Sequence, residues 1–160
     1  FLLGFSSYIF PRAQVSASEP AVSYRLEHNK LALDLIKGNP FGVGIGNQVL
    51  YSVKNEIYQK FGMDQVWQWQ PVHNIYLLIA SEVGILGLLA FLIFLSRIII
   101  HNSLFIIPTI MLLALLAFGL VDHFLWTLQP GRLMLWLILG ILMGVKSAHR
   151  AMDSAQPSEG

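Results

Sequence analysis

Residues 75–96 read IYLLIASEVGILGLLAFLIFLS, a run of 22 residues with a single charged side chain, Glu82. A transmembrane helix needs about 20 consecutive apolar residues, so this stretch predicts a membrane-spanning helix. Residues 103–121 contain no charged side chain over 19 residues and predict a second span. Residues 133–145 form a shorter apolar run of 13, which spans only with little tilt or with help from the residues before it. The expected fold class is therefore all-α, a polytopic membrane helix bundle.

The composition of the whole chain supports a membrane protein and excludes several other classes. Of the 160 residues, 55% are hydrophobic and 12% are charged, whereas a typical globular domain has roughly 25% charged residues. The net charge of +1 excludes nucleic-acid binding through a basic surface, and it also excludes disorder driven by charge. The sequence has no cysteine, which excludes disulfide scaffolds, thiolate metal sites and cysteine nucleophiles.

Polarity divides the chain into four segments. Residues 1–11 are apolar but too short to span a bilayer, so we expect the end of a truncated transmembrane helix and a longer parent protein. Residues 12–72 carry six of the ten Lys and Arg residues and are predicted to form a large extracytoplasmic loop. Residues 73–146 are expected to hold three transmembrane helices. The polar residues 147–160 are expected to form a disordered cytoplasmic tail.

The expected orientation follows from the basic residues in the short connections between spans. Three of them fall on one side of the predicted spans: Arg97, Lys146 and Arg150. Only Arg132 falls in the short connection on the other side. The first side is therefore predicted to be cytoplasmic, and the loop 12–72 and the turn 122–131 are predicted to share the extracytoplasmic side.

The long loop is predicted to contain two amphipathic helices joined by a glycine-rich turn. Apolar residues recur every four positions over 20–37 and again over 47–60, which is typical of helices with one buried stripe. The turn between them, 39–47, reads NPFGVGIGN. Its spacing differs from that of a dinucleotide-binding fingerprint. Gly42, Gly44 and Gly46 instead indicate a tight turn in which the backbone approaches another backbone or a ligand.

His73 stands where the loop enters the first predicted span. Pro71 suits the first position of a helix, which would place His73 in the opening turn. The positive end of the helix dipole would bind an anion there and lower the pKa of the imidazole, leaving a neutral ring that can accept a proton. The alternative interpretation is an interfacial histidine that anchors the helix among lipid headgroups.

Four further polar residues could belong to the same site. Arg25 lies near the start of the first loop helix and has the side chain that grips phosphates in bidentate fashion, although a solvated arginine is the simpler interpretation. Asp122, His123 and Arg132 bracket the short turn 122–131. Either an ion pair between Asp122 and Arg132 closes this turn, or the three residues lie on the rim of the site described above.

The order of several motifs resembles a known family. Arg25 opens a loop helix, NPFGVGIGN follows at 39–47, VHNIYL at 72–77 and SEVGILG at 81–87. Together these motifs are similar to the C-terminal half of the O-antigen ligase and O-antigen polymerase superfamily. The resemblance covers about 24–144.

The resemblance implies a multi-pass protein of the bacterial inner membrane with its active face in the periplasm. Such proteins move a glycan from an undecaprenyl-diphosphate carrier to a glycan, lipid or protein acceptor, without a metal ion or another cofactor. The histidine matching His73 activates the acceptor hydroxyl, and the arginine matching Arg25 binds the diphosphate. Asn74 is expected to orient either the imidazole or the diphosphate. A further arginine lies in the absent N-terminal half, so this chain is expected to be inactive alone.

Several functions remain open at this point. The motifs are shared by ligases, polysaccharide polymerases and protein O-oligosaccharyltransferases. In another class, a non-catalytic membrane transporter or scaffold subunit would fit the composition. Against transport, Glu82 is the only charged residue within a predicted span, whereas transport paths usually need several.

Glu82 points away from His73 on the helix, so a structural hydrogen bond is expected for it. The candidate substrate-binding residues are Asn74, Gly44, Gly46, Arg132, Asp122 and His123.

Overall fold

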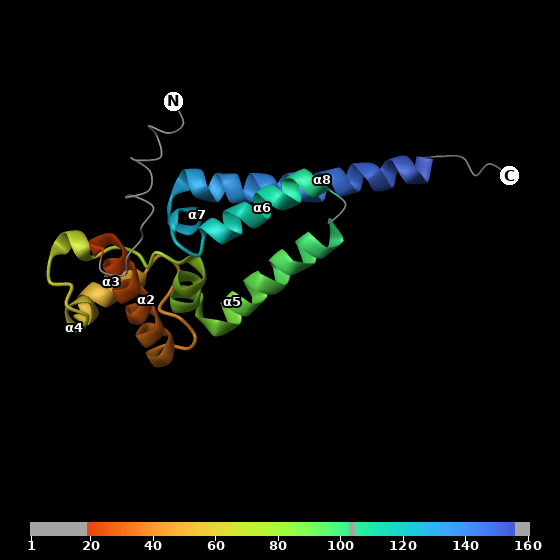
Figure 1. The fold of residues 1–160 in the computed structure, drawn as a ribbon. Helices are drawn as coiled ribbons and strands as arrows, with labels where there is room; N and C mark the ends of the chain where they lie inside the picture. The colour runs from red at the N-terminus through yellow and green to blue at the C-terminus, as the bar shows by residue number, and fades with distance from the viewer. Residues whose placement is uncertain (1–18, 103–104, 156–160) are drawn as a thin grey trace, which may run out of the picture.

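The computed structural model describes residues 19–102 and 105–155, and every regular element in these ranges is a helix (Figure 1). The all-α class is therefore confirmed for the described part of the chain, whereas the helix end expected over 1–11 lies outside it. In chain order the helices are α2 (Pro20–Gly38), α3 (Gln48–Lys54), α4 (Ile57–Lys60), the 3-10 helix η1 (Val66–Gln68), α5 (Ile75–His101), α6 (Ile106–Phe118), α7 (Phe124–Thr127) and α8 (Gln129–Ala155).

Of the two helices predicted in the long loop, the first is present as one helix and the second is divided into two. The first is α2, and its predicted stripe residues Leu31 and Leu35 are buried. The second, predicted over 47–60, is instead two short helices, α3 and α4. Glu56 lies directly before α4 with φ of 54°. A residue in this left-handed conformation cannot continue a right-handed helix, so the chain turns there.

The helix α5 begins at Ile75, later than predicted. The side-chain oxygen of Asn74 accepts hydrogen bonds from two backbone N–H groups of the first turn, at 3.0 and 3.1 Å, so Asn74 is the N-cap. The prediction that Pro71 opens the helix and that His73 lies in its first turn is therefore wrong. Both residues lie before the cap, in the chain that enters the helix.

The helix α5 is interrupted at Gly84, where φ of 85° and ψ of 172° are not helical. The glycine-rich turn pairs with the backbone on both sides of this interruption. The N–H of Gly44 donates to the carbonyl of Glu82 at 2.9 Å, and the N–H of Ile85 donates to the carbonyl of Pro40 at 3.0 Å. The motif at 39–47 and the motif at 81–87 are thus in direct backbone contact.

Two glycines make this close contact possible. A Cβ atom on Gly42 would overlap the carbonyl of Glu82, and one on Gly84 would lie 2.6 Å from the backbone carbon of Phe41. Any side chain at either position would force the two backbones apart. Gly42 of the glycine run therefore serves the approach of backbone to backbone, which is one of the two uses predicted for the run, whereas a Cβ atom on Gly46 would meet nothing within 4 Å.

The apolar helices only partly match the three predicted spans. Among the described residues, only α5 is long and apolar enough to cross a membrane, judged by length and composition. α6 has 13 residues, which corresponds to about 20 Å, and is shorter than the span predicted over 103–121. The apolar part of α8, Gln129–Gly144, is also short. A polytopic bundle is therefore not established. α8 continues to Ala155, where a disordered tail from residue 147 was expected.

The described residues bury two hydrophobic clusters. One comes from α5 to α8 and includes Leu112 and Leu142, and the other comes from the loop helices and the start of α5 and includes Leu31 and Tyr58. Figure 1 shows α2, α3 and α4 gathered at one end, with α6 and α8 running side by side away from them. Trp126 of α7 packs against both clusters. α7 is therefore fixed where the two parts meet, beside the start of α5.

Candidate functional site

Three histidine rings from separate segments meet beside the start of α5. His28 lies on α2, His73 directly before the cap of α5, and His123 directly before α7. The ring centroids of His28 and His73 are 5.4 Å apart, and those of His73 and His123 are 4.9 Å apart, both edge to face. His73 is therefore the central ring of this histidine cluster.

His28 was missed by the sequence analysis, although it is almost fully buried. Its Nδ1 faces the carbonyl oxygen of Tyr24 at 2.7 Å, and its Nε2 faces that of Gln68 at 3.1 Å. The contact with Gln68 ties α2 to η1, and the two contacts together fix the ring beside His73. His28 lies three residues before Leu31 on the predicted buried stripe, and this spacing was the available signal.

Burial is the main cause that lowers the pKa of His73, from 6.5 to about 4. Repulsion from His123, His28 and Arg25 lowers this pKa further, whereas the carboxylate of Asp122 opposes the shift. The ring is therefore neutral at pH 7, as expected from the sequence, but for a different physical reason. His73 lies outside the helix, and desolvation, together with the charge of Arg25, takes the place of the predicted dipole effect.

Arg25 and His73 line one cavity of about 190 Å³. Arg25 reaches it from α2 and is exposed to solvent, so its guanidinium is accessible to a ligand. Tyr24 and Trp67 also line the cavity and contact each other edge to face, with centroids 5.5 Å apart. The Nδ1 atom of His73 is buried without a hydrogen-bond partner. The cavity thus combines a cation with a neutral imidazole.

His123 is held by its own short helix. Its Nδ1 lies 2.6 Å from the hydroxyl oxygen of Thr127. Burial lowers the pKa of His123, with a smaller contribution from His28, while the carboxylate of Asp122 raises it. The same carboxylate accepts a hydrogen bond from the N–H of Phe124 at 2.9 Å. Asp122 and His123 therefore both lie near His73, and Thr127 is a neighbour that the sequence did not indicate.

The side chain of Asn74 mainly makes hydrogen bonds that stabilise the fold. Besides capping α5, its Nδ2 donates to the carbonyl of Leu120 at 3.1 Å. This bond joins the start of α5 to the turn that follows α6. One amide hydrogen stays available to a ligand, since the Nδ2 group has two.

Residues 1–92, more than half of the chain, match the family model described as O-antigen ligase. The chain belongs to this family. No curated protein and no solved structure matches it. The O-antigen ligase family comprises membrane glycosyltransferases of the ligase and polymerase type, which act in lipopolysaccharide and polysaccharide biosynthesis. The matched segment contains Arg25 and His73 but not His123, which lies in the part of the chain beyond it.

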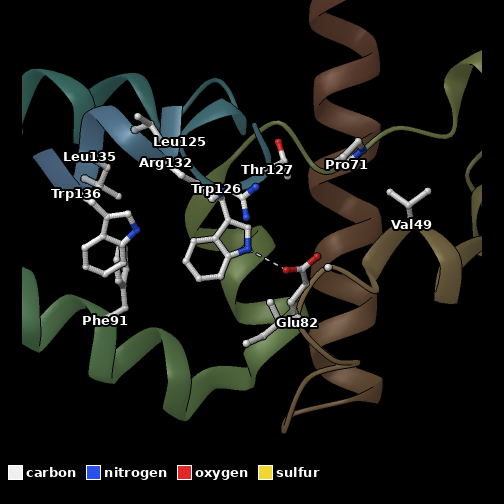
Figure 2. A pocket seen from close by; sticks show the side chains of 12 residues that line it. Val49, Pro71, Glu82, Phe91, Leu125, Trp126, Thr127, Arg132, Leu135 and Trp136 are labelled. Atoms are coloured by element: carbon white, nitrogen blue, oxygen red, sulfur yellow. Dashed lines mark hydrogen bonds between the residues drawn. The ribbon is translucent and has the colours of Figure 1, made fainter. Parts of the chain in front are cut away.

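In this O-antigen ligase family member, a second and larger cavity of about 460 Å³ lies between α5, α7, α8 and the glycine-rich turn. Figure 2 shows the carboxylate of Glu82 directed at the indole of Trp126, which donates a hydrogen bond to it at 2.8 Å. The structural hydrogen bond expected for Glu82 is therefore confirmed. Gly46 and Arg132 also line this cavity.

The ion pair considered between Asp122 and Arg132 is not formed. Within the described residues the one ion pair is between Lys30 and Glu27. Asp122 instead accepts the hydrogen bond that starts α7, while Arg132 is exposed beside the larger cavity. Arg132 therefore lines the larger cavity, whereas Arg25 and His73 line the smaller one, and Asp122 and His123 lie close to His73.

Proposed function

We propose that this chain carries the catalytic residues of an O-antigen ligase-like glycosyltransferase. The donor is a glycan on undecaprenyl diphosphate, the acceptor provides a hydroxyl group, and no metal ion is needed. The observation that carries the proposal is that Arg25 and the neutral His73 line one cavity. The family match supports the general activity. The arrangement offers a cation for a diphosphate and a base for a hydroxyl within reach of one small ligand group.

The proposed reaction is a single displacement at the anomeric carbon of the donor. The acceptor oxygen forms a bond to this carbon while the bond to the diphosphate oxygen breaks. His73 takes the proton of the acceptor hydroxyl, and Arg25 holds the negative charge that develops on the leaving diphosphate. Electrostatic stabilisation of this kind is often the largest contribution to catalysis, and a positioned base contributes about 10²–10⁴ in rate.

Donor binding should convert His73 from a weak base into an effective one. In the free protein the pKa of about 4 is well below the operating pH, and the best catalytic base has a pKa close to it. A diphosphate would neutralise the charge of Arg25 and place negative charge in the same cavity. Both changes favour the imidazolium and therefore raise the pKa of His73. The base then becomes effective when a donor is in place.

The pH dependence of transfer should reveal this change. His73 is competent when neutral, so activity should fall as the pH drops through its pKa. The value of kcat/KM for the donor reports the free protein, and kcat reports the donor complex. The acid limb of kcat should therefore lie at higher pH than that of kcat/KM, which should extend towards pH 4. Rates measured between pH 4 and pH 8 check this, and coincident acid limbs would contradict it.

We place the active face in the periplasm and the apolar helices in the inner membrane. Large apolar side chains are exposed along three helices, for example Leu86 on α5, Ile107 on α6 and Leu137 on α8, at 67%, 75% and 64%. Apolar surface of this extent suits contact with lipid. The known family supports a membrane location. The basic residues noted in the sequence favour a periplasmic position for both Arg25 and His123.

Glycan transfer by the full-length protein tests the proposal. Purified protein in liposomes is given the lipid-linked donor with one of three acceptors: lipid A core, a second donor molecule, or an acceptor protein. Transfer to the first identifies a ligase, to the second a polymerase, and to the third a protein O-oligosaccharyltransferase. We expect ligation. A full-length protein that binds the donor but transfers to no acceptor would instead indicate a transporter or scaffold subunit.

A further inference from the structure

Trp67 is a large aromatic residue at the edge of the cavity that Arg25 and His73 share. It lines this cavity, although 60% of its surface is exposed to solvent. Its indole meets the ring of Tyr24 edge to face, with the centroids 5.5 Å apart. Aromatic side chains beside a few polar groups are typical linings of ligand-binding cavities. The exposed indole is therefore a candidate contact for a ligand.

The nearby Trp69 shows how a tryptophan of the same segment serves the fold. Its ring stacks on that of Tyr58, with the centroids 6.3 Å apart and 20° between the planes. Its indole N–H donates to the carbonyl of Met63 at 3.0 Å. In the part of the chain that the structure describes, no residue accepts a hydrogen bond from the indole N–H of Trp67. The indole of Trp67 therefore keeps both this N–H and most of its apolar surface available.

The backbone around Trp67 is held in place by hydrogen bonds of η1. The side chain of Gln68 accepts a hydrogen bond from the N–H of Gln65, and the N–H of Gln68 donates to the carbonyl of Gln65, both at 2.9 Å. The side chain of Gln70 donates to the carbonyl of Trp67 at 2.9 Å. The contact of Gln68 with His28 joins this support to α2. A contact residue that is already ordered costs little further entropy when a ligand binds.

We propose that Trp67, supported by Tyr24, stacks against the face of a sugar ring at the transfer site. This inference rests on the proposed function, in which the first sugar of the donor is bonded directly to the diphosphate held by Arg25. A sugar acceptor would likewise bring its ring to His73. A pyranose ring has an apolar face of C–H groups bordered by hydroxyl groups, and an indole offers a flat apolar surface of matching chemistry. The exposed amide of Gln70 lines the same cavity and can bind sugar hydroxyl groups.

The test compares Trp67→Leu, which stays apolar but loses the flat ring, with Trp67→Phe, which keeps an aromatic ring. Both are made in the full-length protein in liposomes, and two probes are bound without an acceptor: undecaprenyl diphosphate without a sugar, and the lipid-linked glycan. In Trp67→Leu the affinity for the lipid-linked glycan should fall about two- to tenfold, the factor to which an aromatic contact corresponds. The affinity for the sugar-free diphosphate should not change. Trp67→Phe should keep most of the affinity that the sugar adds.

A second arm identifies which sugar is bound. If the ring belongs to the donor, the loss appears in the affinity for the lipid-linked glycan, as described above. If it belongs to the acceptor, donor affinity is unchanged, and the KM for a glycan acceptor rises by the same factor in Trp67→Leu. Either result supports the sugar contact and names its source.

Val66→Ser is the matched control, because Val66 directly precedes Trp67 on η1, is 72% exposed and is not among the residues that line the cavity. It should bind both probes as the wild type does. An exposed tryptophan can also anchor a protein at a membrane surface. In that case Val66→Ser and Trp67→Leu would both weaken attachment to the liposomes and leave the affinity that the sugar adds unchanged, which would overturn the sugar contact.

Two further results would also overturn it. One is a Trp67→Leu protein with wild-type affinity for the lipid-linked glycan and a wild-type KM for the acceptor. The other is equal weakening of both probes, which would assign the effect to the diphosphate or to the fold. Binding is measured without turnover, so the two proposals fail separately. A wild-type protein that binds the sugar through Trp67 but transfers nothing refutes the proposed function, whereas normal transfer and binding by Trp67→Leu refute only the sugar contact.

Discussion

Replacing His73 with alanine in the full-length protein should reduce glycan transfer by about 10²–10⁴-fold, the contribution of a general base. The ring is only partly buried, and its Nδ1 makes no hydrogen bond. Its loss should therefore leave insertion and donor binding nearly intact. The measurement is the rate of transfer from the lipid-linked donor, together with donor affinity and the amount of protein in the membrane.

Two other histidines provide the controls for this experiment. His101 is exposed in the last turn of α5, far along the helix from the cavity, and His101→Ala should transfer normally. His123→Ala should have a smaller effect than His73→Ala, because His123 lies outside the family-matched segment. Normal transfer by His73→Ala together with an inactive His123→Ala protein would mean that His123, and not His73, is the base. Full activity in all three variants would remove histidine from the mechanism.

Local patterns predicted those parts of the fold that local forces determine. The four-residue spacing of Leu31 and Leu35 identified α2 and its buried face, and the apolar run from residue 75 identified α5. The break in the second loop helix was not predictable in this way. Neither Asn55 nor Glu56 is a strong helix breaker, and the left-handed conformation of Glu56 accompanies the burial of Ile57 and Tyr58 against other helices.

The start of α5 shows how two local signals compete. Pro71 fits a first helical position, but Asn74 is a stronger start signal because its side chain satisfies two backbone N–H groups. Weighting the cap above the proline would have placed His73 outside the helix. The predicted neutral state of His73 still agrees with the structure, because burial disfavours the charged imidazolium just as the expected helix dipole would have done.

The candidate site was predictable where a motif pointed to it, and not where packing over long sequence distances creates it. Arg25 and His73 came from the resemblance, and they line one cavity. The contact of His28 with Gln68 joins residues 40 positions apart, which no local pattern specifies. The ring of His123 meets that of His73 although 50 positions separate the two residues in the sequence. Such contacts depend on the folded arrangement of all the helices.

Replacing Arg25 with lysine should reduce donor use by about 10- to 100-fold, although the positive charge is kept. The guanidinium presents two parallel N–H groups to a diphosphate, whereas an ammonium is a point charge on a flexible stem. Losing one charge-assisted hydrogen bond costs about 1.5–3 kcal/mol, which corresponds to that factor. The loss should appear mainly as weaker donor binding. Donor affinity and transfer rate measured at several donor concentrations distinguish weaker binding from slower chemistry.

A matched arginine outside the cavity serves as the control for the Arg25→Lys variant. Arg97 is exposed on α5, beyond the kink at Gly84, and Arg97→Lys should transfer as well as the wild type. Arg25→Ala should be worse than Arg25→Lys, because it also loses the charge that attracts the diphosphate. A further effect should follow for the base: without the charge of Arg25, the pKa of His73 in the free protein should rise. If Arg25→Lys binds and uses the donor as well as the wild type, Arg25 does not clamp the diphosphate, and its contribution would be limited to long-range attraction.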